Sequence, residues 1–206
     1  MKSELRYGII GAGSMGCEHI ENIKVMGGAV VSAISDPHKP SQEAALAMAP
    51  GAKVFSDHRA LLDSGLIDAV VIATPNDTHA AVLKDVLATD LAVFVEKPLA
   101  TTVEDLKSIL SWDDARSAMT WMGLEYRFMP PIAEAIARAK DGDAGKIHQV
   151  SIREHREPFY PKVDNWNRFT DRTGGTLVEK CCHYFNLMDL VIGQQPIRVF
   201  ASGGQS

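Results

Sequence analysis

Lys97 is the residue whose position most directly suggests chemistry. It follows an apolar run over 91–95, which is typical of a buried strand, and it lies between Glu96 and Pro98. A lysine carries a compact charge that can donate a proton or stabilise an alkoxide when it points into a crevice. The same residues also fit a surface ion pair, which contributes about 1 kcal/mol or less. The spacing alone leaves both interpretations open.

A second candidate set consists of Glu179, His183 and Asn186, on a helix predicted over 177–192. Their spacing of i, i+4 and i+7 would place them on one face of that helix. A histidine four residues after a carboxylate can be oriented by it and can act as a base near neutral pH. Because a lone helical histidine more often has a structural role, this interpretation stays open as well.

The run Cys181-Cys182-His183 raises the question of a metal site. Adjacent cysteines point to different sides of a helix, and zinc sites usually use wider ligand spacings. We therefore expect no metal. The chain has three cysteines in total, which do not make a disulfide framework.

Residues 11–16 read Gly-Ala-Gly-Ser-Met-Gly and are suited to holding a dinucleotide. They lie between an apolar run over 7–10 and a helix predicted over 14–26, which gives the order strand, glycine turn, helix. The N–H groups at the start of such a helix, including those of Ser14 and Met15, face phosphates.

Each glycine of this turn has a distinct physical role. Gly11 allows the tight turn, Gly13 lets a pyrophosphate approach the backbone, and Gly16 lets helix and strand pack closely. A second apolar run over 29–34 leads to Asp36, near the distance at which an acidic residue meets the adenosine ribose. The alternative is an α/β domain with a glycine-rich first turn and no nucleotide.

The loop 74–79 follows another buried apolar run and leads into a predicted helix. Its backbone and Asn76 could touch the ribose or the nicotinamide. We assign four of its residues to cofactor binding: Thr74, Pro75, Asn76 and His79. The alternative is an ordinary turn in which Asp77 or Thr78 caps the helix, and one loop can do both.

Alternating strands and helices organise residues 1–122, which we predict to be an NAD(P)-binding Rossmann domain. The predicted strands are 7–10, 29–34, 53–55, 69–73 and 91–95. The predicted helices are 14–26, 42–48, 78–88 and one beginning at Thr102, with Asp105 in the capping-box position. This order favours an α/β fold with a doubly wound parallel sheet. Ligands bind at the carboxyl ends of such strands, so the loops 11–16, 74–79 and 96–99 should line one crevice.

Residues 123–206 have a different pattern, which we predict to be a partial α+β domain for substrate binding and oligomerisation. A segment over 123–128 leads into a helix that starts near Pro131 and reaches about residue 140. Further along are a strand over 146–155, an aromatic loop over 158–172, the helix over 177–192 and a strand over 197–201. About three strands are near the lower limit for a stable sheet, so the domain looks truncated, or a partner chain covers it.

Bulk composition excludes several classes of protein. The 206 residues are 46% hydrophobic and 23% charged, with a net charge of −5, so nucleic acid and anionic membranes are not expected partners. No apolar run approaches the roughly 20 residues of a membrane helix. The first predicted strand begins almost at once and leaves no room for a signal peptide, so we expect a cytoplasmic protein.

Taken together, these motifs resemble one known family. Residues 11–16, the Glu-Lys-Pro of 96–98 and the stretch 174–183 (Gly-Gly-Thr-Leu-Val-Glu-Lys-Cys-Cys-His) are similar to the glucose–fructose oxidoreductase / inositol dehydrogenase (Gfo/Idh/MocA) family. The segment 126–128 also resembles the strand that leads into that family's second domain. The resemblance implies NAD(P)-dependent oxidation or reduction of a sugar, polyol or related carbonyl compound. It further implies an open second sheet that makes a homo-oligomer.

The resemblance also implies roles for individual residues. Lys97 matches the family's active-site lysine, and His183 matches its catalytic histidine. Glu179 lies where the family commonly has aspartate, and Asn186 lies where many members have a second aspartate. Glu96 and Lys97 are also assigned to cofactor binding.

The leading hypothesis is hydride transfer between a carbinol carbon and nicotinamide. His183 would accept the hydroxyl proton, Lys97 would stabilise the alkoxide and Glu179 would hold the imidazole. Four residues are assigned to substrate binding: Tyr126, Trp166, Asn167 and Arg168. Asp36 favours NAD over NADP, and nearby Lys39 weakens that preference.

Two rival hypotheses remain at this point. One is a non-catalytic dinucleotide- or sugar-binding protein of the same fold, which the asparagine at 186 and the short second domain motivate. The other is a methyltransferase that uses the glycine turn for S-adenosylmethionine, which gives no role to Lys97 or His183.

Overall fold

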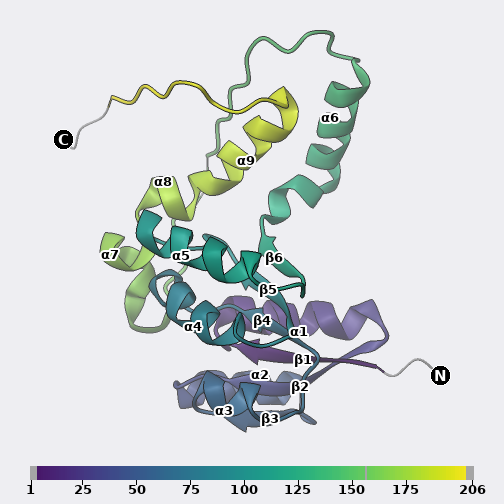
Figure 1. Cartoon of the computed structure of the whole chain (residues 1–206), viewed down its shortest axis with the longest axis vertical. Helices are drawn as coiled ribbons and strands as arrows, with labels where there is room; N and C mark the ends of the chain where they lie inside the picture. The colour runs from purple at the N-terminus through teal and green to yellow at the C-terminus, as the bar shows by residue number, and fades with distance from the viewer. Residues whose placement is uncertain (1–3, 156, 203–206) are drawn as a thin grey trace. The chain divides into compact units, whose positions relative to one another are not determined.

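Six parallel strands form the sheet that carries most of the candidate cofactor residues (Figure 1). The structure is a computed structural model and describes residues 4–155 and 157–202. The strands are β1 (Leu5–Ile10), β2 (Ala29–Ser35), β3 (Lys53–Phe55), β4 (Ala69–Ile72), β5 (Ala92–Glu96) and β6 (Thr120–Gly123). They lie in the order β3-β2-β1-β4-β5-β6, and each neighbouring pair is parallel. The predicted doubly wound sheet is confirmed, and its order reverses between β1 and β4, where such folds bind ligands.

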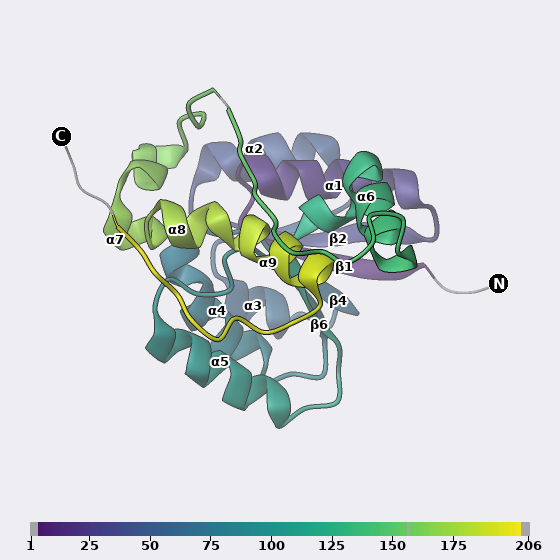
Figure 2. The same cartoon turned by 90° about the horizontal axis from the view of Figure 1, so that it is seen from above.

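Helices cover both faces of this sheet. They are α1 (Ser14–Met26), α2 (Lys39–Met48), α3 (His58–Leu62), α4 (His79–Val86) and α5 (Val103–Asp114). Figure 2 shows α1 and α2 above the sheet and α3, α4 and α5 below it. One buried cluster joins Ile9 of β1 to Ile20 of α1, and a second joins Val70 of β4 to Leu83 and Ile109. All four residues of β4 are buried, as expected for a central strand covered on both faces.

By packing, the described residues form two compact units. The first contains 4–123 together with 158–179, and the second contains 124–155 and 157 together with 180–202. The predicted division of the chain after residue 122 stays a prediction.

The returning segment adds three short helices to the first unit. These are η3 (Val163–Arg168), α7 (Thr170–Thr173) and α8 (Thr176–Glu179), and η3 and α7 replace part of the predicted aromatic loop. Asp77 accepts a hydrogen bond from Arg172 Nε at 2.7 Å, and Asn76 Nδ2 donates to the Thr173 carbonyl at 3.3 Å. These two hydrogen bonds attach the segment 158–179 to the loop that follows β4. The two loop residues lie in the short helix η1 (Asn76–Thr78).

The second unit contains η2 (Glu125–Phe128), α6 (Pro130–Asp141) and α9 (Cys181–Ile192). The predicted helix near Pro131 is confirmed, and it ends at Gly142, whose φ of +87° is the left-handed conformation that favours glycine. The predicted strand segment over 126–128 is wrong: β6 ends at Gly123 and a 3-10 turn follows. Met129 then takes an extended conformation, as a residue before proline does.

Two predicted strands of the second unit are also wrong. In the described part of the chain, neither 146–155 nor 197–201 has strand structure. The accessible areas of Ile197, Val199 and Phe200 are 101%, 84% and 91% of the reference value for an exposed residue. No strand among the described residues therefore covers that segment. Alternating apolar residues make a strand only where a second strand completes the backbone hydrogen bonds.

The predicted continuous helix over 177–192 is interrupted. α8 ends at Glu179, Lys180 lies between the two helices with φ −108° and ψ −46°, and α9 begins at Cys181. The Lys180 side chain is 8% exposed, and its ammonium lies 3.2 Å from Glu154, which gives the buried charge a partner.

Candidate cofactor and catalytic site

The glycine loop joins β1 to α1 at distances that only glycine permits. Gly11 has a φ of +91°, and a Cβ there would lie 2.6 Å from the carbonyl carbon of Ala73. A Cβ on Gly16 would lie 2.1 Å from the Gly11 carbonyl oxygen. Both distances are well inside van der Waals contact. These two glycines therefore bring the ends of β1 and β4 and the start of α1 together.

Gly13 differs because the space beside it is open. Among the described residues, no atom lies within 4 Å of a Cβ built there, and no side chain caps α1 at this position. The first N–H groups of the helix, which include those of Ser14 and Met15, lack intrahelical acceptors and carry the positive end of the helix dipole. This open, electropositive backbone fits the pyrophosphate of a dinucleotide.

Asp36 fixes the end of β2 to the glycine loop. One carboxylate oxygen accepts a hydrogen bond from the Ala12 N–H, and the other accepts one from the His38 N–H, both at 2.7 Å. Because each carboxylate oxygen can accept more than one hydrogen bond, Asp36 keeps capacity for the hydroxyls of a ribose. Its position fits the acidic residue that dinucleotide-binding domains place after their second strand.

The side chains of Asp77 and Thr78 do not cap α4. Asp77 pairs with Arg172, and the Thr78 hydroxyl donates to the Pro75 carbonyl at 2.7 Å and lies 2.8 Å from the Thr74 hydroxyl. The predicted capping role of these two residues is therefore wrong. Their side chains instead stabilise the turn and attach it to the segment 158–179.

Asn76 and His79 are the buried residues of this loop, at 5% and 0% exposure. The two His79 ring nitrogens lie 2.7 Å from the Pro98 carbonyl and 3.1 Å from the Thr74 carbonyl. Burial lowers the pKa of the His79 imidazole, although both carbonyls oppose the shift. His79 thus ties the loop after β4 to the loop after β5. The cofactor-binding roles of Thr74, Pro75, Asn76 and His79 stay predictions.

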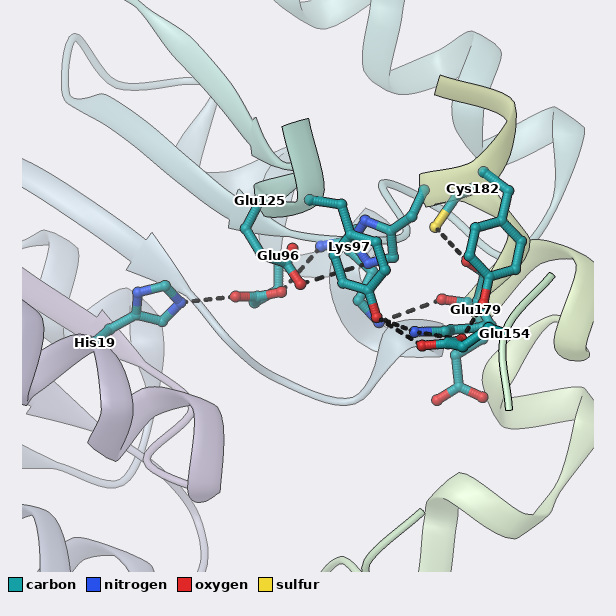
Figure 3. Close-up of polar contacts among 11 residues, drawn as sticks. His19, Glu96, Lys97, Glu125, Glu154, Glu179 and Cys182 are labelled. Atoms are coloured by element: carbon teal, nitrogen blue, oxygen red, sulfur yellow. Dashed lines mark hydrogen bonds and ion pairs between the residues drawn. The ribbon is translucent and has the colours of Figure 1, made fainter. Parts of the chain in front are cut away.

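Lys97 lies directly after β5, where the sequence predicted it. Its ammonium donates a hydrogen bond to the Glu179 carbonyl at 3.2 Å, and its peptide bond to Pro98 is cis. Glu96 is buried, and its carboxylate lies 2.7 Å from His19 Nε2 of α1 while its other oxygen accepts from the Lys97 N–H (Figure 3). The buried carboxylate pairs with His19, and the Lys97 side chain is directed to a carbonyl.

Lys162 is a charged residue of this unit that the sequence interpretation missed. Its ammonium donates a hydrogen bond to the Ser14 hydroxyl, in the first turn of α1. Burial lowers the pKa of Lys162, and the ammonium of Lys97 lowers it further. A lysine in an aromatic loop, 148 residues from its partner, leaves no signal in motif spacing.

The three predicted substrate residues of the segment 158–172 lie in η3. Asn167 is 8% exposed, and its Nδ2 donates to the Tyr160 carbonyl at 2.9 Å. Its Oδ1 is buried and has no hydrogen-bond partner in the part of the chain that the structure describes. Arg168 donates to the Phe159 carbonyl at 2.5 Å, and Trp166 is half-buried.

His183 is buried in the second unit, at 2% exposure. Its ring stacks on that of Tyr126, with centroids 4.2 Å apart and an angle of 12° between the planes. Its Nε2 lies 3.6 Å from a carboxylate oxygen of Glu125, which the sequence interpretation missed. The helix predicted through Glu179 and His183 is interrupted at Lys180, and the orienting role of Glu179 stays a prediction.

The other side chains around His183 form a polar network. Asn186 accepts a hydrogen bond from Arg127 Nε at 3.0 Å and so ties α9 to η2. Lys180 donates to the Tyr126 hydroxyl and lies 4.4 Å from the centre of that ring. Tyr126, predicted as a substrate residue, therefore lies between a buried cation and His183.

Within the described residues, no helix is long and apolar enough to cross a membrane. The same residues contain no group of three or more His, Cys, Asp or Glu side chains that could hold a metal ion.

A parallel sheet with a glycine turn after β1 and an acidic residue after β2 defines a dinucleotide-binding Rossmann domain. Residues 5–124 match the family domain described as "Oxidoreductase family, NAD-binding Rossmann fold". Residues 137–206 match the companion domain "Oxidoreductase family, C-terminal alpha/beta domain". The chain belongs to the Gfo/Idh/MocA oxidoreductase family, as the motifs predicted.

Several relatives of this chain are named inositol dehydrogenases. An inositol 2-dehydrogenase of Rhizobium meliloti (strain 1021) is 30% identical over 198 residues, which are 96% of this chain and 58% of the relative. One from Leifsonia xyli subsp. xyli (strain CTCB07) is 36% identical over 77% of this chain and 47% of the relative. A crystal structure of myo-inositol dehydrogenase from Lactobacillus casei, in complex with NAD(H) and myo-inositol, has a TM-score of 0.74 at 28% identity. It matches 92% of this chain and 54% of its own, so the chain spans little more than half the length of these relatives.

Proposed function

We propose that this protein is an NAD-dependent oxidoreductase that transfers a hydride between nicotinamide and the CH–OH carbon of a sugar or polyol. The observation that carries the proposal is the position of Lys97. In the NAD-binding domain of an oxidoreductase family, a half-buried ammonium lies at the carboxyl end of a central strand and is held by the Glu179 carbonyl at 3.2 Å. Ligands of this fold bind at that edge of the sheet.

The cofactor, when bound, supplies the hydride chemistry itself. The residues that would hold it are the glycine loop with its open helix N-terminus and Asp36, whose carboxylate repels the 2′-phosphate of NADP. The family's NAD-binding domain favours this assignment over S-adenosylmethionine.

Lys97 holds its proton at Nζ and stabilises the substrate oxygen as negative charge develops on it. His183 accepts the proton of the substrate hydroxyl at a ring nitrogen. A carboxylate oxygen of Glu125 lies 3.6 Å from Nε2 of His183 within the same unit and can orient the ring. The role of Glu179 as an orienting carboxylate rests on the family resemblance.

The substrate class is proposed from the names of the relatives. Several are inositol dehydrogenases, and inositol is a ring-shaped polyol. The substrate-binding roles of Trp166, Asn167 and Arg168 come from the sequence alone and stay predictions. Assembly into a homo-oligomer through the second unit and a cytoplasmic location remain parts of the same proposal.

The test replaces Lys97 with methionine, which keeps the length of the side chain and removes its charge. With NAD and a panel of inositols, sugars and sugar alcohols, we expect Lys97→Met to lower kcat by about 100-fold or more. NADH affinity, measured by calorimetric titration, should stay within about twofold because Lys97 acts on the substrate oxygen. Reduced nicotinamide absorbance gives the rate.

Lys84→Met, at an exposed position of α4, is the matched control and should turn over like the parent protein. Normal turnover by Lys97→Met would contradict the role of Lys97. Tight NADH binding by the parent protein with no turnover on any polyol would favour the non-catalytic binding protein instead.

A further inference from the structure

Lys162 reaches the first turn of α1 from a segment far along the chain. Its ammonium donates a hydrogen bond to the hydroxyl of Ser14, the first residue of the helix. The backbone beside Ser14 is the open side of Gly13. A cation therefore lies beside the helix end that already carries positive partial charge.

Charges of both signs surround Lys162. Burial and the nearby ammonium of Lys97 both lower the pKa of Lys162, while Glu96, Glu179 and Glu18 act in the opposite direction. What favours an anion is position, because the Lys162 ammonium lies beside the first turn of α1, whose N–H groups lack intrahelical acceptors.

The segment that carries Lys162 is built to hold a fixed geometry. Asp164 and Asn165 both have positive φ, 53° and 52°, and are the non-glycine residue types that tolerate this conformation best. The Asn165 N–H donates to the Lys162 carbonyl at 2.9 Å. Further along, the buried Asn167 donates from Nδ2 to the Tyr160 carbonyl at 2.9 Å, which fixes the segment further.

We propose that Lys162 is a cofactor-binding residue, which transfers its hydrogen bond from the Ser14 hydroxyl to the pyrophosphate of the dinucleotide. This inference rests on the proposed function, because it requires NAD to bind at the glycine loop. It makes the segment 158–168 part of the cofactor site as well as a candidate substrate loop. When the cofactor binds, Lys162 exchanges the neutral Ser14 hydroxyl for the doubly charged pyrophosphate as its hydrogen-bond acceptor.

An anionic group of the substrate is the alternative to the cofactor pyrophosphate as the partner of Lys162. The contact with Ser14 favours the cofactor, because Ser14 is in the turn of α1 whose N–H groups face phosphates in dinucleotide-binding folds. A substrate group would be expected nearer to Lys97, at the end of β5.

The test is calorimetric titration of the 206-residue chain and its variants with NADH, ADP-ribose and adenosine. A hydrogen bond to a charged group contributes about 1.5–3 kcal/mol, so Lys162→Met should raise the Kd of NADH and of ADP-ribose by about tenfold or more. Adenosine has no phosphate, and its Kd should change by less than about twofold. Lys162→Arg keeps the charge and should retain most of the affinity.

The control is Lys107→Met, which also removes one lysine but at an exposed position of α5. It should bind NADH like the parent protein. The thermal unfolding midpoint of each variant separates a loss of binding from a loss of folding.

Unchanged NADH affinity in Lys162→Met would overturn this inference alone. Failure of the parent protein to bind NADH would instead overturn the proposed function. Loss of polyol turnover with unchanged NADH affinity would assign Lys162 to the substrate.

Discussion

His79 shows how a single buried side chain can join two neighbouring loops. Its ring nitrogens contact carbonyls of the loops after β4 and β5, and its side chain is fully buried. A neutral imidazole has one N–H, so it donates to one of these carbonyls at a time. The geometry of the loop that holds Lys97 therefore depends on a residue in the preceding loop.

The lowered pKa of His79 predicts a loss of stability in mild acid. The unfolded chain binds a proton at His79 below its ordinary pKa of 6.5, and the folded chain does so only at lower pH. The contribution of neutral His79 to the free energy of unfolding should therefore be fully present above pH 6.5. It should decrease as the pH drops below 6.5, by at most about 1.4 kcal/mol per pH unit. Urea unfolding at pH 7.5 and pH 5.5 measures this change.

His79→Asn is the matched variant, because its amide keeps a donor and cannot be protonated. It should be less stable at pH 7.5 and lose less stability between the two pH values than the parent protein. An equal acid dependence in both proteins would show that other groups cause it.

The sequence indicated those candidate site residues that have a distinctive pattern of neighbouring residues. Lys97 follows an apolar run, and the glycine turn lies between a strand and a helix, so their neighbours make them candidates. Lys162 and Glu125 gave no such signal, because each becomes meaningful only through a partner: Ser14, 148 residues away, and His183. The role of a charge depends on what it faces, and a spacing pattern does not contain that information.

At the scale of elements, local capping chemistry agrees with the structure. The Thr102 hydroxyl accepts a hydrogen bond from the Asp105 N–H at 3.1 Å, and the Asp105 carboxylate lies 2.8 Å from the same hydroxyl. This is the start of α5 that the sequence predicted. The interruption at Lys180 has no comparable local signal, and the partner of the buried Lys180 ammonium, Glu154, lies 26 residues away along the chain.

Removing the cap tests how much this local signal contributes. Thr102→Ala leaves the first N–H groups of α5 without their side-chain acceptor and should lower the free energy of unfolding by about 1 kcal/mol. Chemical denaturation measures the change. The control, Lys107→Ala in the exposed face of the same helix, should change it by less than about 0.5 kcal/mol. Equal effects of the two substitutions would refute the capping role.

At the scale of the whole molecule, the two compact units differ in how much core they have. Among the described residues, nearly all buried apolar side chains belong to the sheet and its helices, and Ile136 and Leu187 are the two in the second unit. The alternating pattern over 146–155 predicted a second sheet. A strand needs a partner that completes its hydrogen bonds, and the sequence pattern of one segment cannot supply it.

This difference predicts unequal protection from hydrogen exchange. Amides of β1 and β4 should exchange at least about 100-fold more slowly than those of α6 and α9, because local opening of the second unit exposes little apolar surface. Exchange followed by mass spectrometry of peptides covers both units in one experiment. Similar protection across the two units would mean that the second unit is stabilised by contacts that its own core does not provide.

The return of 158–179 to the first unit also sets an order of events during synthesis. All six strands have been translated once Gly123 has been added, but the segment that supplies Lys162, the carbonyl for Asn76 and the carbonyl for Lys97 follows 35 to 56 residues later (158 − 123 and 179 − 123). At roughly 5–20 residues per second, a ribosome needs about 3–11 seconds to go from Gly123 to the end of this segment. The sheet can therefore pair first while the loops after β4 and β5 wait for their partners. A nascent chain of this protein has its strands before it has its site.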